Sequence, residues 1–576
     1  MSKTLVLALT ASLVLAGCGK DAAEQQADVA GSQQPWAEFA ATVIDDYYAR
    51  NPETAVDAGL HQYDGQMSDL SMAAVDEYAA WLDAVLAEAA TYADLEGIEA
   101  FERDYLSTAL QGELFWIRES GFLTSNPLAY AGAIGISVYV DREYAPLDQR
   151  LLAYTQYMEQ VPAMLEQMKK NLQPPLPAPY VEMGHRVFSG LVEYLSTTVP
   201  GIFLPVADEQ LQRRFKAAND AAVEAIQQSV EWLDGLKASA TDEFALGEEA
   251  FLKMLSATQG VNISLEELTA AGQRNLDANL DMLFEACAEF APGESTEACV
   301  AKVSGNKPEG GAVAGARAQL PMLREFVVDN NIASIPGTED ALVDEAPPHR
   351  RFNFAYINIP GPFETGLPST YYIAPPDPEW SEEDQLAYVP GEADLLAVSV
   401  HEVWPGHFLQ FLHSNRTENN VGQHFGTYTF SEGWAHYTEQ MMVDAGLGNG
   451  DPEVRIGQLL NALLRNVRYM SAIGLHTGGM TVEESQQMFE EKAFQDFGNA
   501  SQQAYRGTYD PGYLNYTLGK LMINKLREDW TTGRGGREAW GRFHDQFLSY
   551  GVPPIPLVRE QMLGDNYDGD EGLLPD

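Results

Sequence analysis

The feature that most constrains the fold is the helical spacing of apolar residues in the first half of the chain. In residues 211–236, apolar side chains recur every three or four positions, and Asp208 precedes them as a candidate N-cap. Residues 72–90 and 151–172 show the same spacing. Because this spacing places apolar side chains on one face of each helix, it predicts helices that pack together. We expect a mainly α, large multi-helix fold.

Two short segments predict a small β-sheet. Residues 352–359 and 369–373 are rich in β-branched and aromatic side chains, which favour strands. Both precede a histidine-rich segment, so we expect the sheet to lie next to the helix that carries those histidines. We predict one large domain over residues 36–570, with a helical part of about 36–345 and a metal-site part of about 346–570.

The N-terminal residues have the composition of an export signal and a tether. Residues 1–17 contain an apolar core too short to span a membrane, and they predict a signal peptide. The Leu-Ala-Gly-Cys sequence ending at Cys18 resembles the bacterial lipobox, and residues 18–35 are small and polar, as in a flexible tether. We expect an envelope protein that faces the periplasm or the cell surface and meets the membrane only through its lipid. A plain secretory signal with an incidental cysteine is the alternative.

Net charge restricts the classes of binding partner, and the cysteine content bears on whether a disulfide forms. The formal net charge is −49 at pH 7, which repels phosphate backbones and argues against nucleic-acid binding. Two further cysteines, Cys287 and Cys299, lie close together in the sequence. An exported protein meets an oxidising compartment, so a disulfide between them is plausible, with two free buried thiols as the alternative.

Histidines cluster in one part of the chain. Six of the ten lie between residues 401 and 476, and the densest piece is residues 401–410, HEVWPGHFLQ. Two neutral imidazoles and a carboxylate suit zinc and leave a position open for water, and a Glu beside the first His can take a proton from that water. We therefore expect His401 and His407 to bind a metal and Glu402 to act as the general base.

The two histidines are six residues apart, whereas the usual zinc-peptidase helix has them four apart. Six residues rotate a straight helix by about 240° net, which would point the side chains apart. Pro405 and Gly406 stand between them, and a break there would turn His407 back toward His401. The alternative is a helix end with two unrelated histidines.

The third ligand should be a carboxylate on a following helix. Residues 429–440, TFSEGWAHYTEQ, place Glu432 at a helix start. Glu439 lies on the same face two turns later, where it could orient a ligand. His436, four residues after Glu432, is a competing ligand.

These motifs together resemble a known family. His-Glu-x-x-Pro-Gly-His-x-x-Gln at 401–410, followed by Glu-Gly-Trp-Ala at 432–435, resembles the bacterial family catalogued as domain of unknown function 885, which is grouped with the gluzincin-type zinc metallopeptidases. The resemblance extends over residues 36–570, although Thr517 stands where the family would have Lys. It implies one zinc ion held by His401, His407 and Glu432, with Glu402 as base, in a metallopeptidase-like fold.

The resemblance also suggests roles for residues around the metal. Donors to a reaction oxyanion are His476, Tyr516 and, less favoured, Tyr509. Arg468 is expected to bind a peptide carboxylate in a fork geometry, or else to form a structural ion pair. The strand that contains Tyr371 and Tyr372 could pair with an extended substrate. Glu439 and Gln410 would support the ligands.

The function expected from these residues is zinc-dependent hydrolysis of peptides. Another metal-dependent hydrolase or amidase would use the same chemistry, and a catalytically inactive metal-binding lipoprotein is a further alternative. The retention of Glu402 argues against an inactive site, because metal storage needs no base beside its ligand.

Overall fold

The computed structural model describes residues 34–347, 350–351, 354–364, 366–376, 378 and 380–575. The predicted signal peptide, Cys18 and nearly all of the predicted tether lie outside these residues. Helices dominate the part that is described, and three strands form one small sheet. The predicted fold class, mainly α with a small β-sheet, is confirmed.

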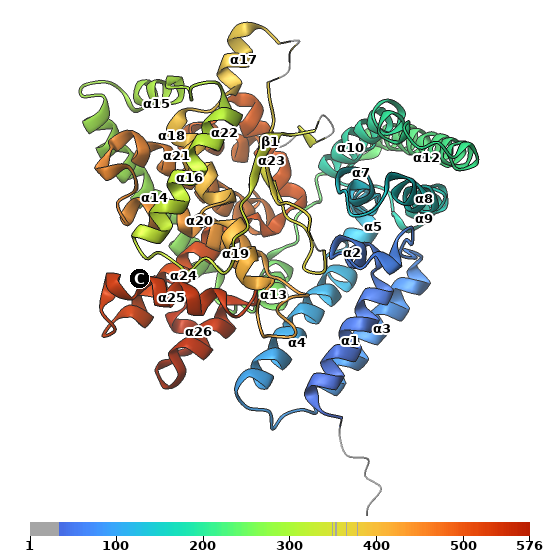
Figure 1. Ribbon diagram of the computed structural model, residues 1–576, viewed down its shortest axis with the longest axis horizontal. Coiled ribbons are helices and arrows are strands. Elements are labelled where there is room, and N and C mark those ends of the chain that lie inside the picture. The colour runs from blue at the N-terminus through green and yellow to red at the C-terminus, as the bar shows by residue number, and fades with distance from the viewer. Residues whose placement is uncertain are drawn as a thin grey trace, which may run out of the picture.

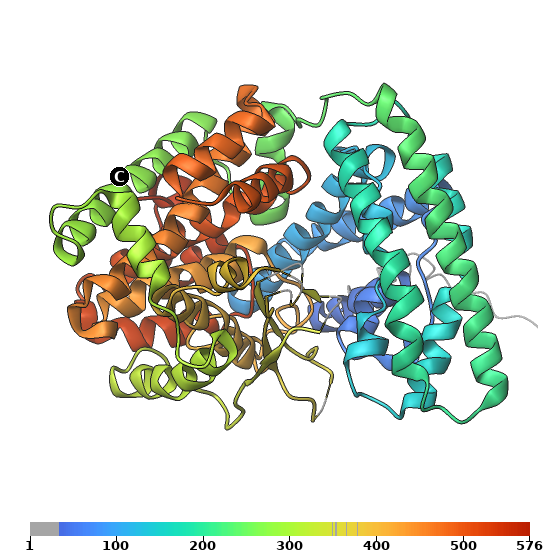
Figure 2. The ribbon, with the colours of Figure 1, turned by 90° about the horizontal axis from the view of Figure 1, so that it is seen from above.

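Two groups of helices lie side by side (Figures 1 and 2). The helices of the first group are α1 (Trp36–Arg50), α2 (Pro52–Asp57), α3 (Met72–Ala89), α4 (Gly97–Arg118), α5 (Phe122–Ser125), α6 (Leu128–Gly132), α7 (Ser137–Asp141), α8 (Leu147–Met158), α9 (Val161–Asn171), α10 (Ala178–Thr197), α11 (Val199–Phe203) and α12 (Glu209–Leu236). Those of the second are α13 (Glu248–Gln259), α14 (Leu265–Phe290), α15 (Thr296–Gly305), α16 (Ala312–Asp329), α17 (Glu382–Tyr388), α18 (Glu392–Glu402), α19 (His407–Ser414), α20 (Tyr428–Asp444), α21 (Pro452–Ile473), α22 (Val482–Lys492), α23 (Phe497–Tyr509), α24 (Asn515–Thr531), α25 (Trp540–Leu548) and α26 (Ile555–Leu563).

The helix with the clearest sequence pattern forms as expected. Asp208 caps α12, because its side chain accepts hydrogen bonds from the backbone N–H groups of Gln210 and Leu211. The apolar face of α12, including Phe215, Ile226 and other buried side chains, joins a core shared with helices α6 to α11. The predicted helix over residues 211–236 is confirmed.

On either side of about residue 240, the buried apolar side chains belong mainly to different clusters. One cluster combines Val56 with residues between 130 and 233, and another combines residues between 36 and 110 with Val421. The largest cluster takes in helices α13 to α16 together with the sheet and the later helices. Helices α13 to α16 therefore pack with the metal-site helices, although they precede residue 346.

The sheet has the order β1-β3-β2, with β1 (Leu342–Glu345) parallel and β2 (Ala355–Asn358) antiparallel to β3 (Thr370–Ile373). Strands β2 and β3 fall inside the two predicted segments, and β1 has no counterpart in the prediction. The sheet lies on the side of the second group that faces the first group (Figure 2). One face of β3 is buried, since Tyr371 and Ile373 have no exposed surface. This buried face lies in the same core cluster as α18, so the sheet supports the helix that carries His401.

A disulfide links two helices of the second group. Cys287 in α14 is bonded to Cys299 in α15, with Cα atoms 5.7 Å apart. The disulfide prediction is confirmed, and two free thiols were the wrong alternative.

None of the helices in the described part of the chain is long and apolar enough to cross a membrane.

Candidate metal centre

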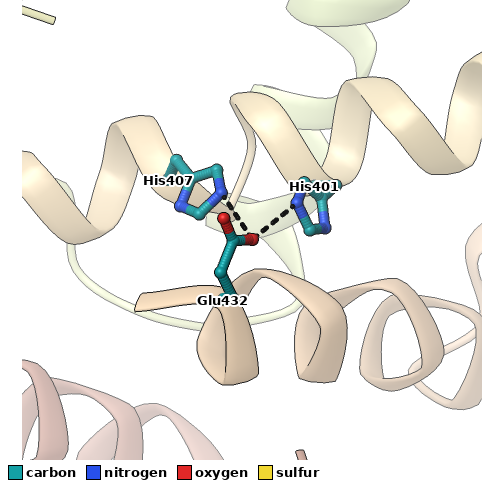
Figure 3. Close-up of side chains that lie close together, drawn as sticks. All are labelled: His401, His407 and Glu432. Atoms are coloured by element: carbon teal, nitrogen blue, oxygen red, sulfur yellow. Dashed lines mark ion pairs between the residues drawn. The ribbon is translucent and has the colours of Figure 1, made fainter. Parts of the chain in front are cut away.

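Three side chains from three helices meet at one point (Figure 3). His401 lies at the end of α18, His407 is the first residue of α19, and Glu432 is the fifth residue of α20, just after its first turn. The Nε2 atoms of both histidines are 3.3 Å from Oε2 of Glu432, and the potential ligand atoms of the three residues all lie within 4.8 Å of one another. The structure therefore brings together the three residues that the sequence predicts as ligands.

The chain achieves this by breaking the helix between the histidines. Helix α18 ends at Glu402 and α19 begins at His407, while the backbone N–H of Gly406 donates to the carbonyl of Val400. A Cβ on Gly406 would lie 1.7 Å from the carbonyl oxygen of His401, so no side chain fits there. The predicted break is confirmed, and it turns the His407 ring toward His401.

Helix α20 packs against the break between α18 and α19. The indole Nε1–H of Trp434 donates to the carbonyl oxygen of Pro405 at 2.9 Å. A Cβ on Gly433 would lie 2.5 Å from the Cα of Gly519 on α24, so the two helices cross in close contact. The Glu-Gly-Trp segment thus supplies the acidic side chain, the close crossing and the tie to the break in three consecutive residues.

The carboxylate of Glu439 determines which ring nitrogen of His401 carries a proton. Nδ1 of His401 lies 2.7 Å from Oε1 of Glu439, whose other oxygen is 3.1 Å from Nδ1 of His436. Arg465 on α21 pairs with the same carboxylate at 3.2 Å. Because Glu439 accepts from Nδ1–H, the Nε2 lone pair of His401 is directed toward Glu432. The predicted orienting position of Glu439 is what the geometry provides, and His436 contacts Glu439 rather than the three converging side chains.

Electrostatics at the centre favour a positive charge. Burial opposes ionisation of Glu432, but the imidazoles of His407 and His401 outweigh it and hold the pKa of Glu432 well below its usual value. Burial and the Arg465 guanidinium lower the pKa of His401, yet the adjacent Glu432 carboxylate and the hydrogen bond to Glu439 outweigh both and raise it. The carboxylates therefore attract either protons or a metal cation to this position.

The donor set fits a zinc ion. Oε2 of Glu432 is buried and has no well-formed hydrogen bond among the described residues, although two Nε2 atoms lie near it. Two ligand atoms bound tetrahedrally at about 2.0–2.1 Å from zinc would be about 3.3 Å apart, which is the separation between each Nε2 and this oxygen. Two imidazoles and one carboxylate are a zinc-type set with a coordination position left for water or substrate.

Glu402 is held beside the centre by the sheet. Its Oε2 accepts a hydrogen bond from the backbone N–H of Ile357 on β2 at 3.0 Å. Strand β2 is an edge strand, and Glu402 occupies one of its outward donors.

Tyr516 lies next to the centre among three arginines. Its ring faces that of His401 at 6.4 Å between centroids, with an angle of 19°. The guanidinium carbons of Arg465, Arg468 and Arg506 lie 5.7, 5.0 and 5.9 Å from the Tyr516 centroid. Tyr516, a predicted site residue, is therefore adjacent both to the candidate ligand His401 and to Arg468, another predicted site residue.

His476 has a different role from the predicted one. Its Nδ1 accepts from the backbone N–H of Leu246, and its Nε2 lies 2.8 Å from the carbonyl oxygen of Gly507, to which it donates. Burial lowers the pKa of His476 to about 4, so the ring is neutral. With both ring nitrogens bound to backbone groups, His476 has no free proton to offer an oxyanion. It instead joins the connection after α12 to α23.

In the described part of the chain, no hydrogen bond, ion pair or ring contact joins the remaining predicted residues to the candidate ligands. Gln410 is buried, and neither of its amide atoms has a hydrogen-bond partner among the described residues, so it does not orient a ligand. Tyr371 is fully buried in the core face of β3, and Tyr372 on the other face packs against Tyr356 at 5.4 Å. Tyr509, half-buried, is the last residue of α23.

The predicted pairing of residues 369–373 with a substrate strand is wrong. Strand β3 is the central strand, hydrogen-bonded to β1 on one side and β2 on the other, so it has no free edge. A peptide could pair only with an outer strand.

A cavity of about 950 Å³ opens on the sheet face that carries Thr370 and Tyr372. Asp141 to Glu143 of the first helix group and Trp404 also line it. The three candidate ligands are not among its lining residues.

Sequence reasoning missed two contributors to the site. Arg465 neutralises Glu439, but an arginine in an amphipathic helix gives no signal that distinguishes it from a solvated surface charge. The N–H of Ile357 holds Glu402, and a backbone donor leaves no trace in residue types.

Comparison with known proteins gives a family and a fold. A family described as "Bacterial protein of unknown function (DUF885)" matches residues 52–562. The fold is similar to that of "a putative lipoprotein of unknown function from Shewanella oneidensis", with 24% identity, a TM-score of 0.76 and coverage of 92% of this chain and 100% of the other. It is also similar to "the putative lipoprotein from Colwellia psychrerythraea", with 17% identity, a TM-score of 0.77 and coverage of 92% and 99%. No curated protein matches the chain.

Proposed function

The chain belongs to the DUF885 family of bacterial proteins of unknown function, and we propose that it is a zinc-dependent metallopeptidase of the gluzincin type. One observation carries the proposal. Two histidines and a glutamate from separate helices converge with zinc-like spacing, and a second glutamate, adjacent in sequence to the first histidine, is held beside them.

His401, His407 and Glu432 would hold the zinc ion. When bound, the ion would supply Lewis acidity that polarises a substrate carbonyl and lowers the pKa of water. Glu439 keeps the proton of His401 on Nδ1, so that Nε2 is free to act as a ligand.

Glu402 is the proposed general base. Because its Oε2 is bound by the N–H of Ile357, Oε1 would take the proton from the attacking water and later deliver it to the leaving amine. Tyr516 is the proposed donor to the oxyanion, since its ring lies against His401 and His476 is bound elsewhere. In a protein that only stores metal, a glutamate next to the ligands would add negative charge without a use. The presence of Glu402 therefore supports catalysis over metal storage.

We further propose attachment to the bacterial cell envelope through a lipid on Cys18. The Leu-Ala-Gly-Cys sequence that ends at Cys18 and the description of two proteins of similar fold as lipoproteins support this. Labelling with a radioactive fatty acid in cells, with Cys18→Ser as the control, tests the attachment.

The function is tested by metal content and hydrolysis together. We expect about one zinc per chain by mass spectrometry, loss of zinc in His407→Ala, and retention in His413→Ala, a histidine of the same helix whose ring contacts the carbonyl of Ser334 instead. Glu402→Gln should retain zinc and lose peptide hydrolysis by about 10²–10⁴-fold. Unchanged turnover in Glu402→Gln would contradict the mechanism, and a zinc-loaded wild type that cleaves no peptide would leave another hydrolase or a binding protein.

A further inference from the structure

Arg468 on α21 is a buried cation without an acidic partner. Only 8% of its surface is exposed, and its one hydrogen bond runs from Nε to the neutral Oε1 of Gln503 at 2.8 Å. In the part of the chain that the structure describes, no carboxylate lies within ion-pair distance of its guanidinium. An isolated buried charge is costly to folding, and a structural role does not account for that cost.

The two neighbouring arginines are neutralised. Arg465 pairs with Glu439 at 3.2 Å, and Arg506 pairs with Asp510 at 2.9 Å. Burial and the nearby guanidinium groups of Arg506 and Arg465 lower the pKa of Arg468, as expected for a cation surrounded by like charge. Its contact with the Tyr516 ring offsets only part of this cost. The cluster thus has one uncompensated positive charge, in a protein whose net charge is −49.

This charge lies close to the candidate metal centre. The Tyr516 ring centroid is 5.0 Å from Cζ of Arg468 and 6.4 Å from the His401 ring centroid. The guanidinium and the imidazole are therefore at most about 11 Å apart, roughly the length of three extended residues.

The surroundings of Arg468 are closely packed. Its neighbours in sequence, Val467 and Tyr469, have no exposed surface, and Gln503, which accepts the hydrogen bond from Nε of Arg468, is also buried. Such packing fits the end of a substrate chain better than an internal segment, which would need room on both sides of the bound group. The two terminal nitrogens of a guanidinium match the two oxygens of a carboxylate in a fork.

We propose that Arg468 binds the C-terminal carboxylate of a peptide substrate, so that cleavage falls within about three residues of the C-terminus. This rests on the proposed peptidase function and specifies its substrate class. In each turnover one water is consumed, the peptide C–N bond breaks, and a new carboxylate and a new amine form. Arg468 is a substrate-binding residue and takes no part in proton transfer.

Affinity selection separates binding from catalysis. Zinc-loaded full-length Glu402→Gln is immobilised and offered three pools of N-acetylated decapeptides of random sequence without acidic side chains, with a free C-terminus, with an amidated C-terminus, or amidated with one internal Glu. We expect the free-acid pool to be retained at least about tenfold better than the simple amide pool, and this preference to vanish in Glu402→Gln/Arg468→Gln. The matched control is Arg455→Gln in the same background, an arginine of the same helix that pairs with Asp444 at its surface, and it should keep the preference.

The outcomes distinguish the two proposals. Equal retention of free acids and amides overturns the role of Arg468, even if the wild type cleaves peptides. Equal retention of free acids and of amidated peptides with Glu assigns the carboxylate to a side chain and overturns the C-terminal assignment. Selective retention together with no cleavage by the wild type supports the carboxylate site and contradicts the peptidase function.

Folding provides an independent readout. Because Arg468 has no ionic partner to lose, Arg468→Gln should unfold at the same temperature as the wild type or at a higher one. A marked fall in its unfolding temperature would identify Arg468 as a structural residue and overturn the proposal.

Discussion

Gly433 and Gly519 are in backbone contact where α20 crosses α24, and a Cβ on Gly433 would lie 2.5 Å from the Cα of Gly519. A Cβ on Gly519 would in turn lie 2.0 Å from the carbonyl oxygen of Thr429. Glu432 precedes Gly433, so the distance between these two helices determines where the candidate ligand sits relative to the two histidines.

Gly433→Ala should therefore destabilise the protein and weaken metal binding. Forcing a methyl group into the crossing costs about 1–3 kcal/mol and moves Glu432 away from His401 and His407. Urea unfolding and zinc titration measure the two effects. The control is Gly190→Ala on α10, where an added Cβ meets nothing within 4 Å and stability should rise by up to about 1 kcal/mol. Equal stability of Gly433→Ala and wild type would refute the close crossing.

Glu439→Gln should weaken zinc binding by about 10–100-fold. The neutral amide removes the charge that holds the Nδ1 proton of His401 and leaves Arg465 without its ionic partner. Competition with a chelating dye measures the affinity. Asp444→Asn, on the same helix in a surface pair with Arg455, should leave the affinity unchanged. If both variants bind zinc like the wild type, Glu439 does not orient His401.

Tyr516→Phe should retain zinc and lose turnover by about 10²-fold. Only the hydroxyl is removed, so the ring contact with His401 persists while the proposed oxyanion donor is lost. The loss is measured as kcat at saturating peptide, relative to the wild type. The same substitution at Tyr505 on α23 is the control. A change confined to KM would place the hydroxyl in substrate binding instead.

His476→Ala should lower the free energy of unfolding by about 2–4 kcal/mol. It removes two hydrogen bonds, to the N–H of Leu246 and the carbonyl of Gly507, and leaves a cavity against Phe251. We expect zinc content and kcat per folded molecule to stay near those of the wild type. A loss of kcat in a fully folded His476→Ala would restore the catalytic role that the sequence suggests.

Stability should fall as the pH drops below about 6.5. Burial lowers the pKa of His424 and His476 to about 4 and that of His544 to about 3. Between these values and the unfolded pKa of about 6.5, the unfolded chain binds more protons than the folded chain, so protonation favours unfolding. His424 and His476 each contribute up to about 3 kcal/mol, present above pH 6.5 and lost as the pH falls toward 4, and the larger contribution of His544 is lost as the pH falls toward 3.

Urea unfolding at pH 7.5, 6.5 and 5.5 measures this dependence. His424→Asn keeps an acceptor for the Tyr48 hydroxyl but cannot be protonated, so its stability should decline less steeply. Parallel curves for the variant and the wild type would show that His424 does not contribute.

The sequence was most informative where local rules act. The 3.6-residue spacing of α12, its Asp208 cap and the break at Pro405 and Gly406 are properties of neighbouring residues, and all three are present. Strand β1 was not predicted, because its four residues, LVDE, have no strand pattern and become a strand only by pairing with β3. For the same reason, no local pattern could show that β3 would be central and without a free edge.

At the site, residue types and spacing identified His401, Glu402, His407, Glu432 and Glu439 in advance, because ligand chemistry restricts which side chains can serve and the helix sets their faces. Whether Arg468 is neutralised, and whether His476 is free, depended on the elements packed around them, which come from distant parts of the chain. Burial and pairing are properties of packing, whereas ligand type is a property of the residue. The sequence therefore determined which groups could bind a metal, and only the tertiary structure decided which positive charge near them has no carboxylate partner among the described residues.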